Sequence, residues 1–329
     1  MSDPSEHKQH CGNVAIVGRP NVGKSTLLNR LIGQKLSITA RKPQTTRHAI
    51  IGVSTVDSYQ AVYLDTPGIH QQGKRALNQV LNRTAANSLH DVDVVVWVIQ
   101  ALGWNEHDER ARKFVEAAAH ADVPLFMFIN KVDRVEPRNR LLPFLDSLPV
   151  SEGADSEENP ATYSRVEVIP GSALKGTAVD VLQKQIFDAL PEAPFRFAED
   201  DLTDRSSRFL AAEHVREQLT RQLSDELPYA LTVEIEQFNE SPDLLRIGAV
   251  IWVEKDSQKG IVIGKKGERL KEVGSRARQS LQQLFERKVF LQLWVRVKAG
   301  WADDERALQS LGYTDHADEY PKAAGKRLK

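Results

Sequence analysis

The sequence has almost no cysteine and no long apolar run. Its single cysteine, Cys11, excludes an internal disulfide framework and is typical of proteins from a reducing compartment. No run of about 18 apolar residues occurs, so we expect no membrane span. Residues 1–10 are polar and lack the apolar core of a secretory signal. We therefore expect a cytoplasmic protein.

Net charge is also nearly absent: 44 Lys and Arg against 45 Asp and Glu give −1. The whole composition thus does not indicate nucleic-acid binding, but the distribution of charge does. Residues 255–298 hold twelve Lys or Arg and four Asp or Glu, a local balance of +8. This asymmetry indicates a polyanion site in one part of the chain. The length of 329 residues predicts about two domains.

A glycine-rich turn lies near the N-terminus. Residues 18–25 match G-x-x-x-x-G-K-S, between an apolar run at 13–17 and a helical pattern at 26–32. Strand, turn and helix in this order predict a phosphate-binding loop. Lys24 is expected at the β- and γ-phosphates and Ser25 at Mg²⁺. The predicted nucleotide contacts here are Gly18, Asn21, Val22, Gly23, Lys24, Ser25 and Thr26.

A second motif, which begins with an aspartate, follows a predicted strand at 60–64. Residues 65–68 are D-T-P-G. A carboxylate at a strand end beside a phosphate loop is expected to hold the Mg²⁺ shell, which assigns Asp65 to the metal. Gly68 would let the backbone approach the γ-phosphate.

The motif N-K-V-D at 130–133 predicts guanine recognition. The Asp133 carboxylate can accept hydrogen bonds from the guanine N1–H and 2-amino groups, which adenine lacks. A buried acceptor left unpaired costs about 1–3 kcal/mol, so this carboxylate also rejects adenine. Asn130 and Lys131 complete the motif, and a loop at 172–174 is expected against the guanine edge through Ser172, Ala173 and Leu174.

The order of elements predicts an α/β fold followed by an α+β fold. Strands and helices alternate over 12–190, which predicts a doubly wound, mostly parallel sheet with its site at the strand C-termini. Residues 33–47 are expected to be a mobile loop and 191–202 a linker. The second domain is predicted over 203–300, with Thr203 as N-cap of a helix at 204–223, and 301–329 as a C-terminal tail.

Residues 263–267, I-G-K-K-G, resemble the core of a KH domain. The surrounding order of helix, two strands, helix–GxxG–helix and strand resembles its type II form. The resemblance implies that the loop clamps the backbone of about four nucleotides. The expected RNA contacts are Gly264, Lys265, Lys266, Gly267 and Lys271.

The five stretches of the first domain resemble the five boxes of a small GTPase, with Q-T-T-R at 44–47 as the second box. The resemblance implies that Thr46 senses Mg²⁺ and the γ-phosphate. The catalytic set is then Lys24, Thr46 and Gly68. Ile69 follows Gly68, where many GTPases carry a water-orienting glutamine, so intrinsic hydrolysis is expected to be slow or to rely on another group or partner. Asn21 resembles branches that recruit K⁺.

A GTPase domain followed by a KH domain is the layout of the Era family, which this chain resembles from residue 11 to about residue 313. The resemblance implies GTP and GDP as ligands and 16S rRNA near its 3′ end as partner. It also implies a role in maturation of the small (30S) ribosomal subunit and peripheral association with the cytoplasmic face of the inner membrane. We expect a monomer.

Two other function classes stay open from the sequence. One is a GTP-regulated protein–protein switch whose KH-like module binds no RNA. A shallow salt dependence of RNA binding would favour that class. The other is a metabolic P-loop ATPase, which competition between guanine and adenine nucleotides distinguishes.

The first prediction concerns base selectivity. Asp133→Asn should weaken GTP binding and shift preference toward xanthine nucleotides, because the 2-oxo group of xanthine can accept from the new amide. Competition between XTP and GTP for the variant measures this shift. Unchanged affinity for GTP would show that Asp133 does not contact guanine.

Overall fold

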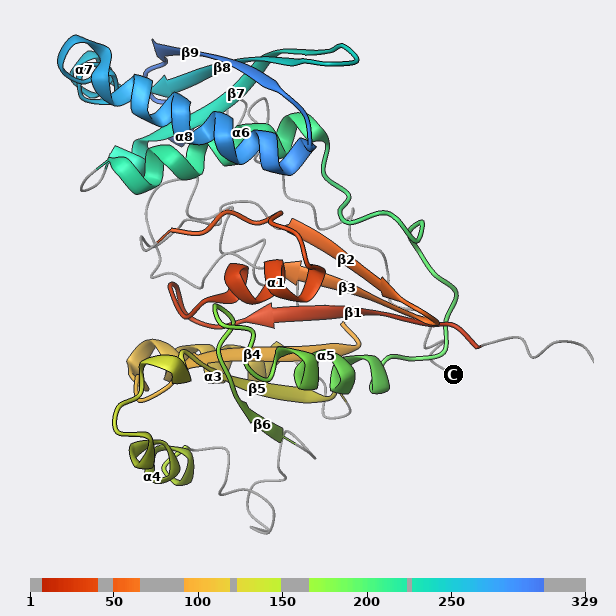
Figure 1. Ribbon diagram of the computed structural model, residues 1–329. Coiled ribbons are helices and arrows are strands. Elements are labelled where there is room, and N and C mark those ends of the chain that lie inside the picture. Colours follow the sequence, from red (N-terminus) through yellow and green to blue (C-terminus); the bar gives the residue numbers. More distant parts are fainter. Residues whose placement is uncertain are drawn as a thin grey trace, which may run out of the picture.

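The computed structural model describes residues 8–40, 50–65, 92–118, 123–148, 166–223 and 227–304. These residues form two sheets, of six and three strands. We call the six-stranded sheet with its helices the first domain and the three-stranded sheet with its helices the second domain (Figure 1). The predicted sequence of an α/β and an α+β fold is confirmed, while the numerical domain limits stay a prediction.

The first sheet has the strand order β2-β3-β1-β4-β5-β6. Strand β1 pairs in parallel with β3 and β4, and the parallel pairing continues from β4 through β5 to β6. Among the described strands of this sheet, only β2 runs antiparallel to its neighbour, β3. The strands are β1 (His10–Val17), β2 (Ile50–Val56), β3 (Tyr59–Asp65), β4 (Val94–Gln100), β5 (Leu125–Asn130) and β6 (Val166–Pro170).

Helices cover both faces of this sheet, which explains why every residue of β4 except the last, Gln100, is apolar. Side chains of β4 alternate between two buried clusters, one under α1 and α5 and the other under α3. A strand buried on both faces requires continuous rather than alternating hydrophobicity. The helices are α1 (Lys24–Ile32), α3 (Glu106–Ala118), α4 (Leu141–Asp146) and α5 (Val179–Asp188), with 3-10 turns η1 (Val132–Arg134) and η2 (Arg138–Arg140).

The second domain packs α6 and α8 on one face of the sheet β7-β8-β9. Strand β7 is antiparallel to β8, and β8 is parallel to β9. No described helix is both long and apolar enough to cross a bilayer. The elements are α6 (Ser207–Gln222), η3 (Leu227–Ala230), β7 (Leu231–Glu240), β8 (Leu245–Val253), α7 (Asp256–Ile263), η4 (Lys265–Gly267), α8 (Glu268–Phe285), β9 (Val289–Val297) and η5 (Trp301–Asp303).

The N-cap prediction for the first helix of the second domain is wrong. Helix α6 begins at Ser207, and the Ser206 hydroxyl accepts a hydrogen bond from the Phe209 amide at 3.3 Å. Thr203 lies three residues earlier, and its hydroxyl donates to the Ile51 carbonyl of β2 at 2.6 Å. A strand carbonyl therefore takes the hydroxyl that was expected to cap the helix.

The segment at 191–202, predicted as a linker, is hydrogen-bonded along the first sheet. The Gln60 side-chain oxygen accepts from the Arg196 and Phe197 amides at 2.8 and 3.1 Å. Further on, the Val53 amide of β2 donates to the Leu202 carbonyl at 2.8 Å. These bonds fix the course of the chain between the two domains.

One buried histidine links helices of the second domain. His214 on α6 is 1% exposed, and its Nδ1 lies 2.7 Å from the Ser280 hydroxyl of α8. Burial lowers the pKa of His214 from 6.5 to about 4, and the Lys35 charge acts in the same direction. Glu217 and Glu213 oppose this shift. The imidazole is therefore neutral at physiological pH.

A pH dependence of stability follows. Below pH 6.5 the unfolded chain protonates this imidazole while the folded chain does not, so stability is lost as pH falls from about 6.5 to about 4. The contribution is about 3 kcal/mol over that range. Urea unfolding of wild type and His214→Asn should show parallel pH profiles above pH 7 and a steeper loss for wild type below pH 6. Parallel profiles throughout would refute the assignment.

Candidate nucleotide and RNA sites

The phosphate loop joins β1 to α1 and needs glycine at two close approaches. Gly18 and Gly23 have φ of 145° and 111°, in the region that favours glycine. A Cβ on Gly18 would lie 2.3 Å from the Val98 carbonyl oxygen, and one on Gly23 would lie 2.2 Å from Asn130 Nδ2. The loop is thus packed directly on the ends of β4 and β5.

Lys24 is held inside this loop. Its Nζ donates to the carbonyls of Gly18 and Arg19 at 2.9 and 3.1 Å, and the residue is only 6% exposed. Burial lowers the pKa of Lys24 to about 8, against the opposing attraction of the Asp65 carboxylate. A phosphate oxygen would give this buried ammonium a negatively charged hydrogen-bond partner.

Asp65 ends β3 beside the loop, in an arrangement that fits Mg²⁺. Its Oδ2 accepts from the hydroxyls of Ser25 and Ser37, each at 2.8 Å. Its Oδ1 is buried and has no hydrogen-bond partner in the part of the chain described. Burial raises the pKa of Asp65, although Lys24 and the two serines oppose the shift. Carboxylate and hydroxyl oxygens are the donors that this cation prefers.

The N-K-V-D motif is built into the same edge of the sheet. Asn130 Nδ2 donates to the Val22 carbonyl at 2.7 Å, and its Oδ1 accepts from the amides of Lys131 and Ala173 at 2.8 and 2.9 Å. Lys131 Nζ donates to the Asn21 carbonyl at 2.7 Å. These bonds join the phosphate loop to the segments expected around the base.

Asp133 and Leu174 are exposed beside that junction, whereas Ser172 and Ala173 are buried. Arg30 on α1 donates from Nη2 to the Leu174 carbonyl at 2.7 Å. The structure therefore gathers at one sheet edge every predicted nucleotide contact in 18–26, 65, 130–133 and 172–174. Their roles stay a prediction. Thr46, Gly68 and Ile69 lie outside the described residues.

The prediction of a mobile loop at 33–47 is wrong for its first part. Leu36, Ser37 and Ile38 are buried, with exposures of 2%, 0% and 0%. Asn29 Oδ1 accepts from the amides of Leu36 and Ser37 at 2.9 and 2.8 Å. No motif marks Asn29 or Ser37 in the sequence. The apolar neighbours of Ser37 were the one available indication that this stretch packs against the domain.

The G-x-x-G loop lies between α7 and α8, with its lysines toward solvent. Lys265 and Lys266 are exposed, as is Lys271 on α8. Gly264 and Gly267 have φ of 73° and 80°, so both occupy conformations that favour glycine. The loop immediately precedes the α8 N-terminus, where backbone N–H groups favour anions.

Sequence comparison agrees with this two-part arrangement. A family model described as 50S ribosome-binding GTPase matches residues 13–131, and a KH domain model matches residues 226–302. GTPase Era of Pseudomonas aeruginosa strain LESB58 is 51% identical over 315 residues, 96% of this chain and 99% of that protein. The chain belongs to the Era family of GTPases. Era of Stenotrophomonas maltophilia strain K279a is also 51% identical, over 95% of this chain and all of its own length.

Solved structures of Era proteins have the same fold. Era in complex with MgGDPNP and nucleotides 1506–1542 of 16S ribosomal RNA superposes with a TM-score of 0.83, at 38% identity, over 93% of this chain and 99% of that one. Aquifex aeolicus Era Y63A bound to GDP.AlF4⁻ gives a TM-score of 0.84 with the same identity and coverage. The expected family is thus confirmed, and with it GTPase activity.

Asn130 provides a test of the junction between loop and base. Asn130→Ala would leave the Val22 carbonyl and the Ala173 amide without this partner, and each buried unpaired group costs about 1–3 kcal/mol. We expect GDP affinity to fall about 10–100-fold, because a factor of ten corresponds to about 1.4 kcal/mol. Calorimetric titration with GDP measures the change. Asn239→Ala, at an exposed position of β7, is the control. Equal affinities of both variants would contradict the account.

Proposed function

We propose that this GTPase binds guanine nucleotide at the C-terminal edge of its first sheet and 16S rRNA, near the 3′ end, through its second domain, and thereby assists maturation of the small (30S) subunit. The observation that carries the proposal is the presence in one chain of a phosphate loop hydrogen-bonded to the N-K-V-D motif and an exposed, lysine-bearing G-x-x-G loop. The local charge of +8 over residues 255–298 favours a polyanionic partner.

On the nucleotide side, the chain positions charge and excludes the wrong base. Lys24 would exchange the two carbonyls that it now contacts for β- and γ-phosphate oxygens. Asp133 would accept from the guanine edge, while Asn130 and Lys131 keep that edge in register with the phosphate loop. The backbone of 172–174 would pack against the guanine edge.

Ser25 and Asp65 would hold Mg²⁺, with Thr46 as the predicted third ligand. When bound, the cation neutralises charge on the β- and γ-phosphate oxygens. Oδ1 of Asp65, which has no hydrogen-bond partner among the residues that the structure describes, supports this assignment. Lys24, Thr46 and Gly68 are the proposed catalytic set.

On the RNA side, the G-x-x-G loop would let a single-stranded backbone lie against the peptide and the α8 N-terminus. Lys265 and Lys266 would contact phosphates, and Lys271 would extend the basic surface along α8. A related Era was crystallised in complex with nucleotides 1506–1542 of 16S rRNA, which supports RNA as a partner of this chain. A purely protein-binding switch lacks such support.

Further expectations belong to the same proposal. We expect K⁺ near Asn21, whose backbone has a left-handed φ of 64° in the phosphate loop. We also expect a cytoplasmic monomer with peripheral association at the membrane. The K⁺ site and the membrane association rest on the family resemblance, and the cytoplasmic location rests on the single cysteine.

The RNA proposal makes a direct prediction about the loop glycines. Gly264→Asp with Gly267→Asp should abolish binding to a small-subunit rRNA fragment, because the new side chains add bulk and repel phosphate. GDP binding should stay near wild type. Lys265→Ala and Lys266→Ala should be milder and lower the salt slope by about one for each phosphate that the variant no longer binds. Filter binding over a salt series, beside GDP titration, measures both.

Gly300→Asp provides a matched control for Gly267→Asp. Both glycines have positive φ, 71° and 80°, and a Cβ at either position meets nothing within 4 Å. The two single variants therefore carry similar backbone strain at different places. We expect weakened RNA binding only for Gly267→Asp. Undiminished RNA binding by the double variant would refute the KH assignment, and equal effects of the two single variants would attribute the loss to strain.

A further inference from the structure

The segment 34–40 is held from both domains, at the point where the chain leaves α1. On the side of the first domain, Asn29 fixes the backbone of Ser37: its Oδ1 accepts from the Ser37 amide and its Nδ2 donates to the Ser37 carbonyl at 2.7 Å. The Ser37 hydroxyl donates to Oδ2 of Asp65, the same oxygen that Ser25 contacts. This short segment therefore contacts the proposed Mg²⁺ carboxylate directly.

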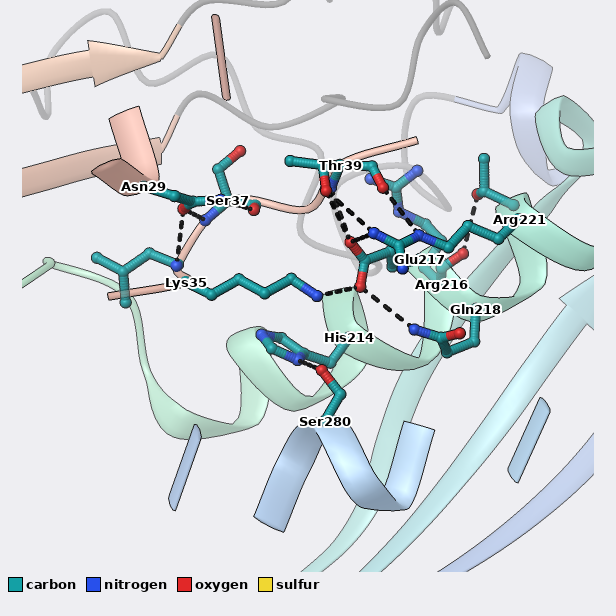
Figure 2. Close-up of polar contacts among 12 residues, drawn as sticks. Asn29, Lys35, Ser37, Thr39, His214, Arg216, Glu217, Gln218, Arg221 and Ser280 are labelled. Carbon is teal, nitrogen blue, oxygen red and sulfur yellow. Dashed lines mark hydrogen bonds and ion pairs between the residues drawn. The ribbon is translucent and has the colours of Figure 1, made fainter. Parts of the chain in front are cut away.

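On the side of the second domain, a buried carboxylate of α6 holds the same segment (Figure 2). Glu217 is 0% exposed. Its Oε1 accepts from the Thr39 amide at 2.9 Å and from the Thr39 hydroxyl at 3.3 Å. Its Oε2 forms an ion pair with Lys35. Arg221, one turn later on α6, donates to the Thr39 carbonyl at 3.0 Å and to Glu217 Oε1 at 2.9 Å.

Both oxygens of Glu217 are therefore paired, and two of their donors are cationic. A buried carboxylate is tolerated only when it is paired in this way, and removing one partner leaves an uncompensated charge. The contact specifies the position of the segment because it includes a backbone amide as well as side chains. Asp65, in contrast, keeps one buried oxygen without a partner among the described residues.

The spacing of these contacts links the two carboxylates. Glu217 contacts Lys35 and Thr39, which lie two residues before and two residues after Ser37. Ser37 is thus fixed on both sides by the second domain while its hydroxyl holds Asp65. We propose that Glu217 is a positioning residue for the Mg²⁺ site: through Lys35, Thr39 and Ser37, the second domain sets the orientation of the Asp65 carboxylate. The inference rests on the proposed nucleotide site.

This role differs from simple docking of two domains. A docking contact would alter stability, whereas a positioning contact must also alter how tightly the nucleotide site holds Mg²⁺. Outer-shell partners of metal ligands typically contribute about 10–100-fold to metal affinity. We expect about a 10-fold loss for Ser37→Ala, which contacts Asp65, and about 3–10-fold for Glu217→Gln, which acts one contact further away.

The full-length protein loaded with fluorescent mant-GDP provides the test. The dissociation rate of mant-GDP is measured over a MgCl₂ titration and in excess EDTA. Glu217→Gln should raise the Mg²⁺ concentration for half-maximal retention about 3–10-fold. The rate in EDTA should stay at the wild-type value, because the contacts of Lys24 and Asp133 are unchanged. Glu240→Gln removes an exposed carboxylate that pairs with Arg287 in the second domain, and it should match wild type throughout.

Lys35→Met completes a double-mutant cycle and avoids changing α6. It should shift the Mg²⁺ midpoint in the same direction as Glu217→Gln. The double variant Lys35→Met with Glu217→Gln should shift the midpoint by less than the product of the two single shifts, because both changes break the same ion pair. Should Glu217→Gln fail to fold, Lys35→Met and Ser37→Ala decide the question on their own.

Wild-type Mg²⁺ midpoints for Glu217→Gln and Lys35→Met would overturn the proposal. A changed rate in EDTA with an unchanged midpoint would also overturn it, because the contact would then act on the phosphate loop. Failure of the wild-type protein to bind mant-GDP at all would instead refute the nucleotide site itself.

Discussion

The structure depends most on an electrostatic arrangement that the protein alone leaves incomplete. Among the described residues, Asp65 is buried with one oxygen unpaired, and the buried Lys24 donates from Nζ to the carbonyls of Gly18 and Arg19. Each is a costly feature, because burial disfavours both charges: it raises the pKa of Asp65 and lowers that of Lys24. In the proposed nucleotide complex, a phosphate group and its cation would pair with Lys24 and Asp65, and this pairing would offset part of the cost of burying the two charges.

The parallel sheet explains how such a site can be assembled from distant segments. The phosphate loop leaves β1, Asp65 ends β3 and Asn130 ends β5, so three separate parts of the chain meet at one edge. The packing is close enough to require glycine, as the distance from a Cβ on Gly23 to Asn130 shows. The strand ends thus fix the backbone at each of these groups.

The sequence predicted the contiguous motifs well and the long-range contacts poorly. The motifs at 18–25 and 130–133 are short, and their chemistry depends on local spacing, so their place in the fold could be predicted. Glu217 could not be identified, because its partners lie 178 and 182 positions away and its neighbours form an ordinary helix. The cap at Ser206 was missed for a similar reason: Thr203 is as good a cap by residue type, but a strand carbonyl binds its hydroxyl.

The second domain has two faces with different chemistry. One presents the exposed G-x-x-G loop, and the other inserts the buried Glu217 carboxylate against the first domain.

The central claim is that this GTPase acts on ribosomal RNA through the face that carries the G-x-x-G loop. Ultraviolet crosslinking of the full-length protein to 16S rRNA, with the joined peptides identified by mass spectrometry, tests it most directly. We predict crosslinked peptides from residues 255–298 joined to nucleotides near the 3′ end, and crosslinks confined to residues 8–190 would contradict the claim.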